Sequence, residues 1–246
     1  MVTIECDVQD DVLTMTYKDK SISVDLEKVR ERRNVRTASL FQEERSEGLD
    51  CGDEVSAFLS EIFEEPDTRL LMHEKDLYTN RGCVIKRNAW NAEIPIRTDK
   101  TAFADDAPYM ICTEGSLDEL NTRLKEKAVI EQFRPSILIE KCAPWDEDKW
   151  LTIHIGDVAL QCLKPCLRCV MTTIDPVEGT KNPAVEPLKT LREFRLAPEG
   201  PMRDDCKDNP IFGVDAGLIY PGHIHVGQTV YVRYKSEYIK QTPFYT

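Results

Sequence analysis

The chain has 246 residues, 41% of them hydrophobic and 31% charged, a composition that is typical of globular proteins. Its formal net charge of −12 disfavours nonspecific nucleic-acid binding, so we expect no nucleic-acid partner. The longest apolar runs, such as residues 137–139, are far too short to span a bilayer, and the N-terminus carries no signal-peptide pattern.

The N-terminal segment predicts a small antiparallel β meander. Leu13, Met15 and Tyr17 alternate with polar neighbours, and the turn-like stretches DVQDD and KDK separate successive runs. The basic segment KVRERRNVR, residues 28–36, is interpreted as a solvated loop. A helix is predicted over about 53–64, because apolar residues recur there at helical spacing behind an acidic first turn.

The middle of the chain alternates between strands and one helix. TRLLMHE predicts a short strand, residues 74–107 a long surface loop, and APYMICT another strand. GSLDELNTRLKEK predicts a helix whose capping box has Ser116 accepting a hydrogen bond from the Glu119 amide.

The C-terminal half predicts mostly strands. FRPSILIEK reads as one strand, WLTIHIGDVALQCLKP as two strands around Gly156-Asp157, and residues 168–174 as a further strand. EPLKTLREFR predicts a short helix. GLIYPGHIHVGQTVYVRY predicts a strand pair joined through Pro221-Gly222, with His223 and His225 on one face. Many short strands with few helices favour a β-barrel with helical decoration over a doubly wound parallel sheet.

The stretch KPCLRCV contains a C-x-x-C pair that is compatible with several roles. Nine scattered cysteines indicate mostly free, buried thiols rather than a disulfide framework. Zinc binding would need a full tetrahedral set, for which Cys162, Cys166, Cys169 and Cys206 are the candidates. Thiol-disulfide exchange would need a helix after the motif, where a strand is predicted. A single thiolate on a redox metal and simple packing both remain open from the spacing alone.

The residues that follow the pair carry a family resemblance. CLRCVMTTIDPVEGT and EPLKTLREFR resemble the molybdenum-cofactor MOSC domain, and in particular the mitochondrial amidoxime-reducing component family. Segments such as LDCGDEVSAFLSEIF, SLDELNTRL, FRPSILI and NPIFGVDAGLIYPGHIHVGQTVYV resemble family segments in the same order. The match runs from roughly residue 1 to 233.

The resemblance implies a fold class that is α+β and mostly β. A MOSC β-barrel with helical insertions would accompany a partial N-terminal β-subdomain. The implied boundaries are 1–75 for that subdomain, 76–107 for a connecting loop, 108–236 for the barrel and 237–246 for a tail. Relative to the family, the chain is expected to be truncated at its N-terminus, without the opening strands and the membrane anchor.

The resemblance also implies a molybdenum-molybdopterin cofactor and the residues that hold it. Cys169 matches the molybdenum ligand and would be the catalytic residue. The pterin phosphate, or a pyridoxal phosphate-like group, needs donors and positive charge. The residues at the positions of the family's cofactor contacts are Asp105, Asp106, Arg134, Ser136 and Arg168, together with Cys169. Among them, Asp106 replaces a hydroxyl residue of the family and Ser136 an asparagine. A carboxylate at Asp106 requires either an outward orientation or a neighbouring cation.

The implied activity is the reduction of small N-hydroxylated substrates such as amidoximes and hydroxylamines. A b-type cytochrome and its NADH-dependent reductase would donate the electrons. Family resemblance implies association with the mitochondrial outer membrane, with a cytoplasmic location as the alternative because no membrane span is expected in this chain. Leu167, Asp106 and Ala107 replace family hydroxyl residues, so the alternative reading is a MOSC-like binding module without cofactor.

Overall fold

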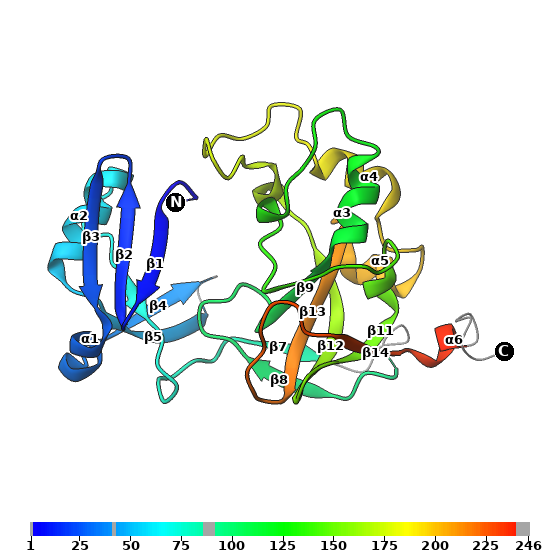
Figure 1. Cartoon of the computed structure of the whole chain (residues 1–246), viewed down its shortest axis with the longest axis horizontal. Coiled ribbons are helices and arrows are strands. Elements are labelled where there is room, and N and C mark those ends of the chain that lie inside the picture. Colours follow the sequence, from blue (N-terminus) through cyan, green and yellow to red (C-terminus); the bar gives the residue numbers. More distant parts are fainter. Residues whose placement is uncertain (1, 41–42, 86–91, 240–246) are drawn as a thin grey trace. The chain divides into compact units, whose positions relative to one another are not determined.

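The computed structural model describes residues 2–40, 43–85 and 92–239. The chain divides into two compact units. The first comprises Met1–Arg81 with Pro176–Gly179, and the second comprises Gly82–Asp175 with Thr180–Thr246. Figure 1 colours the first unit mainly blue to cyan and the second mainly green to red.

The first unit begins with the antiparallel meander that the alternating pattern predicts. Its strands pair in the order β1-β2-β3, with bounds β1 Glu5–Gln9, β2 Val12–Tyr17 and β3 Lys20–Asp25. The basic segment that follows is a helix, α1 Leu26–Arg32, so its interpretation as a loop is wrong. Asp25 caps this helix by accepting a hydrogen bond from the Lys28 amide, and basic residues in the last turn complement the helix dipole.

A second sheet and a helix complete this unit. The sheet order is β4-β5-β6, with bounds β4 Val35–Leu40, β5 Glu44–Asp50 and β6 Leu71–Met72. Helix α2 spans Asp53–Phe63, which confirms the predicted helix to within one residue. Val55 and Leu59 on its buried face pack with Met15, Val29 and Leu49 in one apolar cluster. Burial of this cluster is the main favourable contribution to the folding of the unit.

Asp50, at the end of β5, is the buried charged centre of the first unit. Its side chain is 1% exposed, and its carboxylate accepts a hydrogen bond from the Gly52 amide at 2.8 Å. It also pairs with Arg36, and with Arg69 Nη1 at 3.3 Å. Burial alone would raise the pKa of Asp50, but the Gly52 amide and the two arginines outweigh burial and lower that pKa below 3.8.

We expect Asp50→Asn to lower the free energy of unfolding by about 1–2 kcal/mol at pH 7, because the charge-assisted hydrogen bonds are lost. A carboxyl whose folded-state pKa is lowered stabilises the protein above its ordinary pKa and loses that effect as pH falls. The difference from wild type should therefore shrink below about pH 4 in urea unfolding curves. Asp19→Asn, a substitution at an exposed residue, is the control. A stability difference between Asp50→Asn and wild type that does not change with pH would contradict the lowered pKa of Asp50.

The second unit is built on a six-stranded sheet that confirms the predicted fold class. Its order is β10-β9-β13-β12-β11-β14, antiparallel except for the parallel pair β9 and β10. The bounds are β9 Tyr109–Thr113, β10 Ile137–Ile139, β11 Trp150–Ile155, β12 Val158–Leu167, β13 Ile211–Tyr220 and β14 Val230–Tyr234. One face buries a core of Ile111, Trp150, Ile153, Leu160 and Val214. The hairpin around Gly156 is confirmed, since β11 and β12 pair directly.

Two predictions about the start of this unit need correction. The long loop predicted over 74–107 contains, in its described part, an antiparallel pair, β7 Gly82–Ile85 and β8 Arg97–Lys100. The strand pattern of β8 is hidden in the sequence because charged residues occupy it. Arg97 and Asp99, two residues apart on this strand, form an ion pair. Helix α3, Glu114–Asn121, begins earlier than predicted, since the Thr113 hydroxyl accepts from the Ser116 amide.

The last two strands are not the predicted pair. β13 pairs with β9 and β12, whereas β14 pairs with β11. Residues 221–229 form the connection between them, so His223 and His225 lie in an exposed loop and not on a strand. Pro221 lacks an amide proton and Gly222 favours turns, so pairing ends after Tyr220.

Helices cover one end of the six-stranded sheet (Figure 1). The remaining helical elements are η1 Ile130–Gln132, η2 Asp146–Lys149, η3 Val170–Thr173, α4 Leu188–Phe194, α5 Pro201–Cys206 and α6 Ser236–Ile239. Leu120 of α3 and Leu191 of α4 are buried against Phe133 and Phe212. Among the described residues, we find no helix of the length and apolar character that crossing a membrane requires.

Candidate functional site

Cys169 lies on the surface just beyond the end of β12. The predicted strand over 168–174 is wrong, because β12 ends at Leu167 and a 3-10 turn occupies Val170–Thr173. Both the amide and the hydroxyl of Thr172 donate to the Cys169 carbonyl oxygen, at 3.2 and 3.0 Å. Such local threonine bonds compete with sheet pairing. The thiol of Cys169 is therefore exposed and held on a short, hydrogen-bonded turn.

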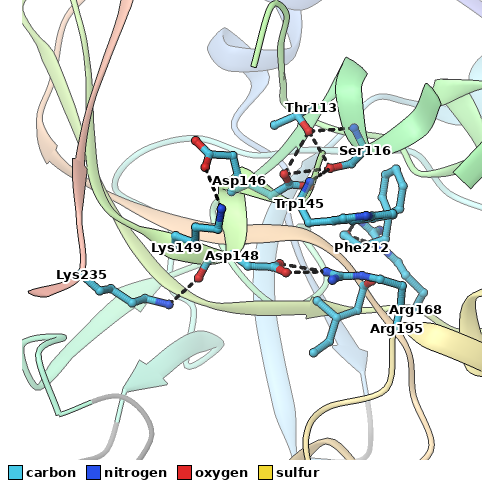
Figure 2. A network of polar contacts seen from close by, with 12 residues as sticks. Thr113, Ser116, Trp145, Asp146, Asp148, Lys149, Arg168, Arg195, Phe212 and Lys235 are labelled. Carbon is cyan, nitrogen blue, oxygen red and sulfur yellow. Dashed lines mark hydrogen bonds and ion pairs between the residues drawn. The ribbon is translucent and has the colours of Figure 1, made fainter. Parts of the chain in front are cut away.

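Arg168 points in the opposite sense, into the interior, and is 8% exposed. Its Nε and Nη2 donate to the Phe212 carbonyl oxygen at 2.8 and 2.7 Å, as Figure 2 indicates. Its Nη1 donates to the Phe133 carbonyl oxygen at 3.1 Å. The guanidinium also lies near both phenyl rings, which stack 3.9 Å apart. These contacts make Arg168 a positioning residue, and direct contact with a cofactor stays a prediction.

Arg134 is brought near Cys169 by this buried arginine. Arg134 follows Phe133 and Cys169 follows Arg168, so the hydrogen bond from Arg168 to the Phe133 carbonyl holds the two segments together. A second bond, from Gln132 Nε2 to the Thr172 carbonyl oxygen at 3.0 Å, joins the same two segments. The Arg134 side chain is exposed. An exposed thiol and an exposed guanidinium therefore belong to one region of the surface.

Ser136 joins this region through Met110. The Ser136 amide donates to the Met110 carbonyl at 2.8 Å, and the Met110 amide donates to the Ser136 hydroxyl at 3.2 Å. The Met110 sulfur in turn accepts a hydrogen bond from Arg168 Nη2 at 3.0 Å. Arg168 thus connects the segments that carry Cys169, Arg134 and Ser136.

Asp105 and Asp106 precede β9 and are both exposed. Lys164 Nζ pairs with the Asp106 carboxylate at 2.5 Å. Lys164 lies on β12, the strand that leads to Cys169. The cation that Asp106 requires near an anionic group is therefore present. Sequence reasoning missed Lys164, although a lone charged residue in the run VALQCLKPCL was a visible signal.

A buried carboxyl lies behind this ion pair. Asp215 of β13 stands opposite Lys164 in the sheet, is 2% exposed, and has no hydrogen-bond partner for Oδ2 among the described residues. Its carboxylate also interacts with the Cys166 thiol. Burial, with a smaller effect of Asp106, raises the pKa of Asp215 to about 7 against the opposing effect of Lys164. Sequence reasoning missed Asp215, whose signal was a lone acid inside IFGVDAGLI.

Glycine is required at position 213 to bring the site's strands together. Gly213 has φ 83°, a left-handed conformation that favours glycine. A Cβ at this position would lie 2.6 Å from the Ile111 carbonyl oxygen. Because Gly213 lets β13 approach β9 closely, the neighbouring Phe212 carbonyl oxygen is oriented to accept the hydrogen bonds of Arg168.

The zinc and disulfide interpretations of the C-x-x-C pair find no supporting geometry among the described residues. All nine cysteines are free thiols. Across residues 2–40, 43–85 and 92–239, no group of three or more His, Cys, Asp or Glu side chains is arranged to hold a metal. Burial raises the pKa of Cys166 well above its ordinary value, so Cys166 is a neutral thiol at neutral pH. Cys169 is thus the exposed member of the pair.

Comparisons with known proteins confirm the resemblance inferred from the sequence. The family model of the MOSC domain matches residues 98–231. Mitochondrial amidoxime-reducing component 1 of Danio rerio is 37% identical over 188 residues, which are 75% of this chain and 54% of that protein. Mitochondrial amidoxime reducing component 2 of Bos taurus is 34% identical over 187 residues, 75% of this chain and 53% of that protein. Mitochondrial amidoxime-reducing component 1 of Homo sapiens is 34% identical over 186 residues, 76% of this chain and 53% of that protein. The chain spans about half the length of the curated relatives it matches.

Proposed function

Because this chain belongs to the MOSC domain family, we propose that it is a molybdenum-cofactor-dependent reductase of small N-hydroxylated compounds. The observation that carries the proposal is the exposed Cys169 thiol in one surface region with the exposed Arg134. The names of the relatives supply the substrate class, amidoximes.

The described residues fit a molybdenum-molybdopterin cofactor. Cys169 would ligate the metal, since a soft thiolate suits a redox metal that also carries organic sulfur ligands. Arg134 and the Ser136 hydroxyl would bind the anionic pterin phosphate, and Lys164 compensates the Asp106 charge beside them. The buried Arg168 would position the segments that carry Cys169, Arg134 and Ser136. When bound, the cofactor supplies a redox centre that exchanges two electrons with the substrate.

The proposed reaction converts an amidoxime, two electrons and two protons into an amidine and one water. A b-type cytochrome and its NADH-dependent reductase would deliver the electrons singly. From the same family relationship we propose a mitochondrial location, with the cytoplasm as the alternative. We assign 1–75 and 108–236 as the N-terminal β-subdomain and the barrel, joined by 76–107 and followed by a tail, 237–246.

The test is molybdenum content after expression in a host that supplies the cofactor. Wild type should purify with about one molybdenum per chain, and Cys169→Ala should lose the metal while its circular dichroism stays unchanged, because the only protein thiolate on the metal is removed. Cys166→Ala is the matched control and should retain the metal. Benzamidoxime reduction with the cytochrome and reductase present should follow the metal content.

A folded but metal-free wild type would overturn the proposal. It would favour the second candidate, a MOSC-like binding module without cofactor. The observation behind that candidate is that Asp106 and the inward-facing Arg168 leave fewer phosphate donors than the family pattern implies.

A further inference from the structure

A separate cavity of about 430 Å³ opens on the second unit. Its walls come from β12, β13, the segment that follows α4, and the residues around Lys235. Trp150, Pro198, Met202, Ile211 and Val214 form its apolar lining. This volume lies within the range of small-molecule sites, roughly 300–1,000 Å³. Lys164, the partner of Asp106, is part of its lining, whereas Cys169, Arg134 and Ser136 are not.

Most of the charges in this cavity are already compensated. Arg195 Nη2 donates to both carboxylate oxygens of Asp148, at 2.9 and 2.8 Å, and its guanidinium stacks on Trp145 at 4.1 Å (Figure 2). Lys164 pairs with Asp106. Glu93 accepts from the Ser236 amide through both carboxylate oxygens, at 3.0 Å each. These groups form the polar frame of the site.

Lys235 is the exception. Its Nζ donates to the backbone carbonyl oxygen of Asp148 at 2.7 Å, as Figure 2 shows. No carboxylate of the described chain forms an ion pair with it: Arg195 pairs with the Asp148 carboxylate, and Glu93 accepts from the Ser236 amide. The Glu237 carboxylate also lines the cavity and acts on Lys235 without forming an ion pair. Burial lowers the pKa of Lys235, against the effect of the nearby acids, so its charge is poorly solvated. An ammonium group with two unused protons beside an apolar wall is complementary to an anionic oxygen attached to an apolar body.

We infer that this cavity binds a small monocarboxylate with an apolar chain, its carboxylate on Lys235 and its chain against Trp150 and Met202. The ligand site shares Lys164 with the surroundings of the proposed cofactor site but contains none of the residues that would contact the cofactor, and the inference does not depend on the proposed function. Specificity would come from Lys235, the one cation of the lining that forms no ion pair among the described residues, since a neutral analogue would leave it without a counter-ion.

The experiment is isothermal titration calorimetry of the full chain with octanoate and with 1-octanol. Wild type should bind octanoate saturably and at least about tenfold more tightly than octanol, because only octanoate forms a charge-assisted hydrogen bond. Lys235→Gln should weaken octanoate binding about tenfold or more, and Lys235→Arg should restore most of it. Lys149→Gln, at a lysine that pairs with Asp146 outside the cavity, is the matched control and should bind as wild type does.

Three outcomes would overturn the inference: no saturable octanoate binding, equal binding of octanoate and octanol, or wild-type affinity in Lys235→Gln. The comparison of octanoate with octanol uses wild type alone, so it tests the preference for a carboxylate even if the variant at Lys235 does not fold. Measurements on the metal-free Cys169→Ala protein should give the same octanoate affinity, which separates this inference from the fate of the cofactor proposal.

Discussion

Arg168→Met should lower the free energy of unfolding of the metal-free protein by about 3–5 kcal/mol. The variant leaves the carbonyl oxygens of Phe212 and Phe133 without their donor, and each unsatisfied buried group costs about 1–3 kcal/mol. Methionine fills part of the space, so the loss arises mainly from hydrogen bonding. Urea unfolding followed by circular dichroism measures the effect.

Arg134→Met is the matched control for this prediction. It removes an exposed guanidinium, so its unfolding free energy should stay within about 0.5 kcal/mol of wild type. Its molybdenum content should nevertheless fall if Arg134 binds the pterin phosphate. A result in which Arg168→Met is as stable as wild type would contradict the positioning role.

Asp215→Asn should make the protein more stable than wild type above pH 7 and remove part of the pH dependence of unfolding. A carboxyl whose folded-state pKa is raised binds a proton in the folded state that the unfolded chain has already released. Stability therefore falls as pH rises from the ordinary pKa of 3.8 to about 7. The increase in the pKa of Asp215 corresponds to a loss of at most about 4 kcal/mol in the free energy of unfolding. An asparagine amide does not ionise, so the variant avoids this loss.

Unfolding free energies at pH 5, 6, 7 and 8 test this prediction. The gain of Asp215→Asn over wild type should grow with pH and level off near pH 8, because the carboxyl is then ionised in both states. Asp157→Asn, at an exposed hairpin turn, should run parallel to wild type at every pH. Two parallel curves for Asp215→Asn and wild type would show that Asp215 is not protonated when buried.

Elements with a clear repeating pattern could be predicted from the sequence. The meander at the N-terminus, helix α2 and the hairpin around Gly156 agree with the structure, because alternation and helical spacing directly reflect which face is buried. The family was also recognisable from CLRCVMTTIDPVEGT and EPLKTLREFR, since the matched residues lie in one contiguous motif region.

Residues whose conformation depends on distant partners could not be predicted. The run after Cys169 is rich in β-branched residues, yet it forms a 3-10 turn. Threonine hydroxyls bond to nearby carbonyls, and no strand among the described residues pairs with the turn. β14 was expected to pair with β13, but its edge position beside β11 depends on the whole sheet.

In the candidate site, too, features that depend on local sequence could be predicted and features that depend on distant residues could not. The sequence by itself determined the fold class, the family and the identity of Cys169 as the candidate ligand, because these depend on local pattern and motif. Only the tertiary structure decided that Arg168 faces inward, that Lys164 compensates Asp106, and that Asp215 is buried. The reason is physical: charge compensation and burial depend on groups that the folded chain brings together from distant positions, such as Arg168 with Phe133 and Lys164 with Asp106.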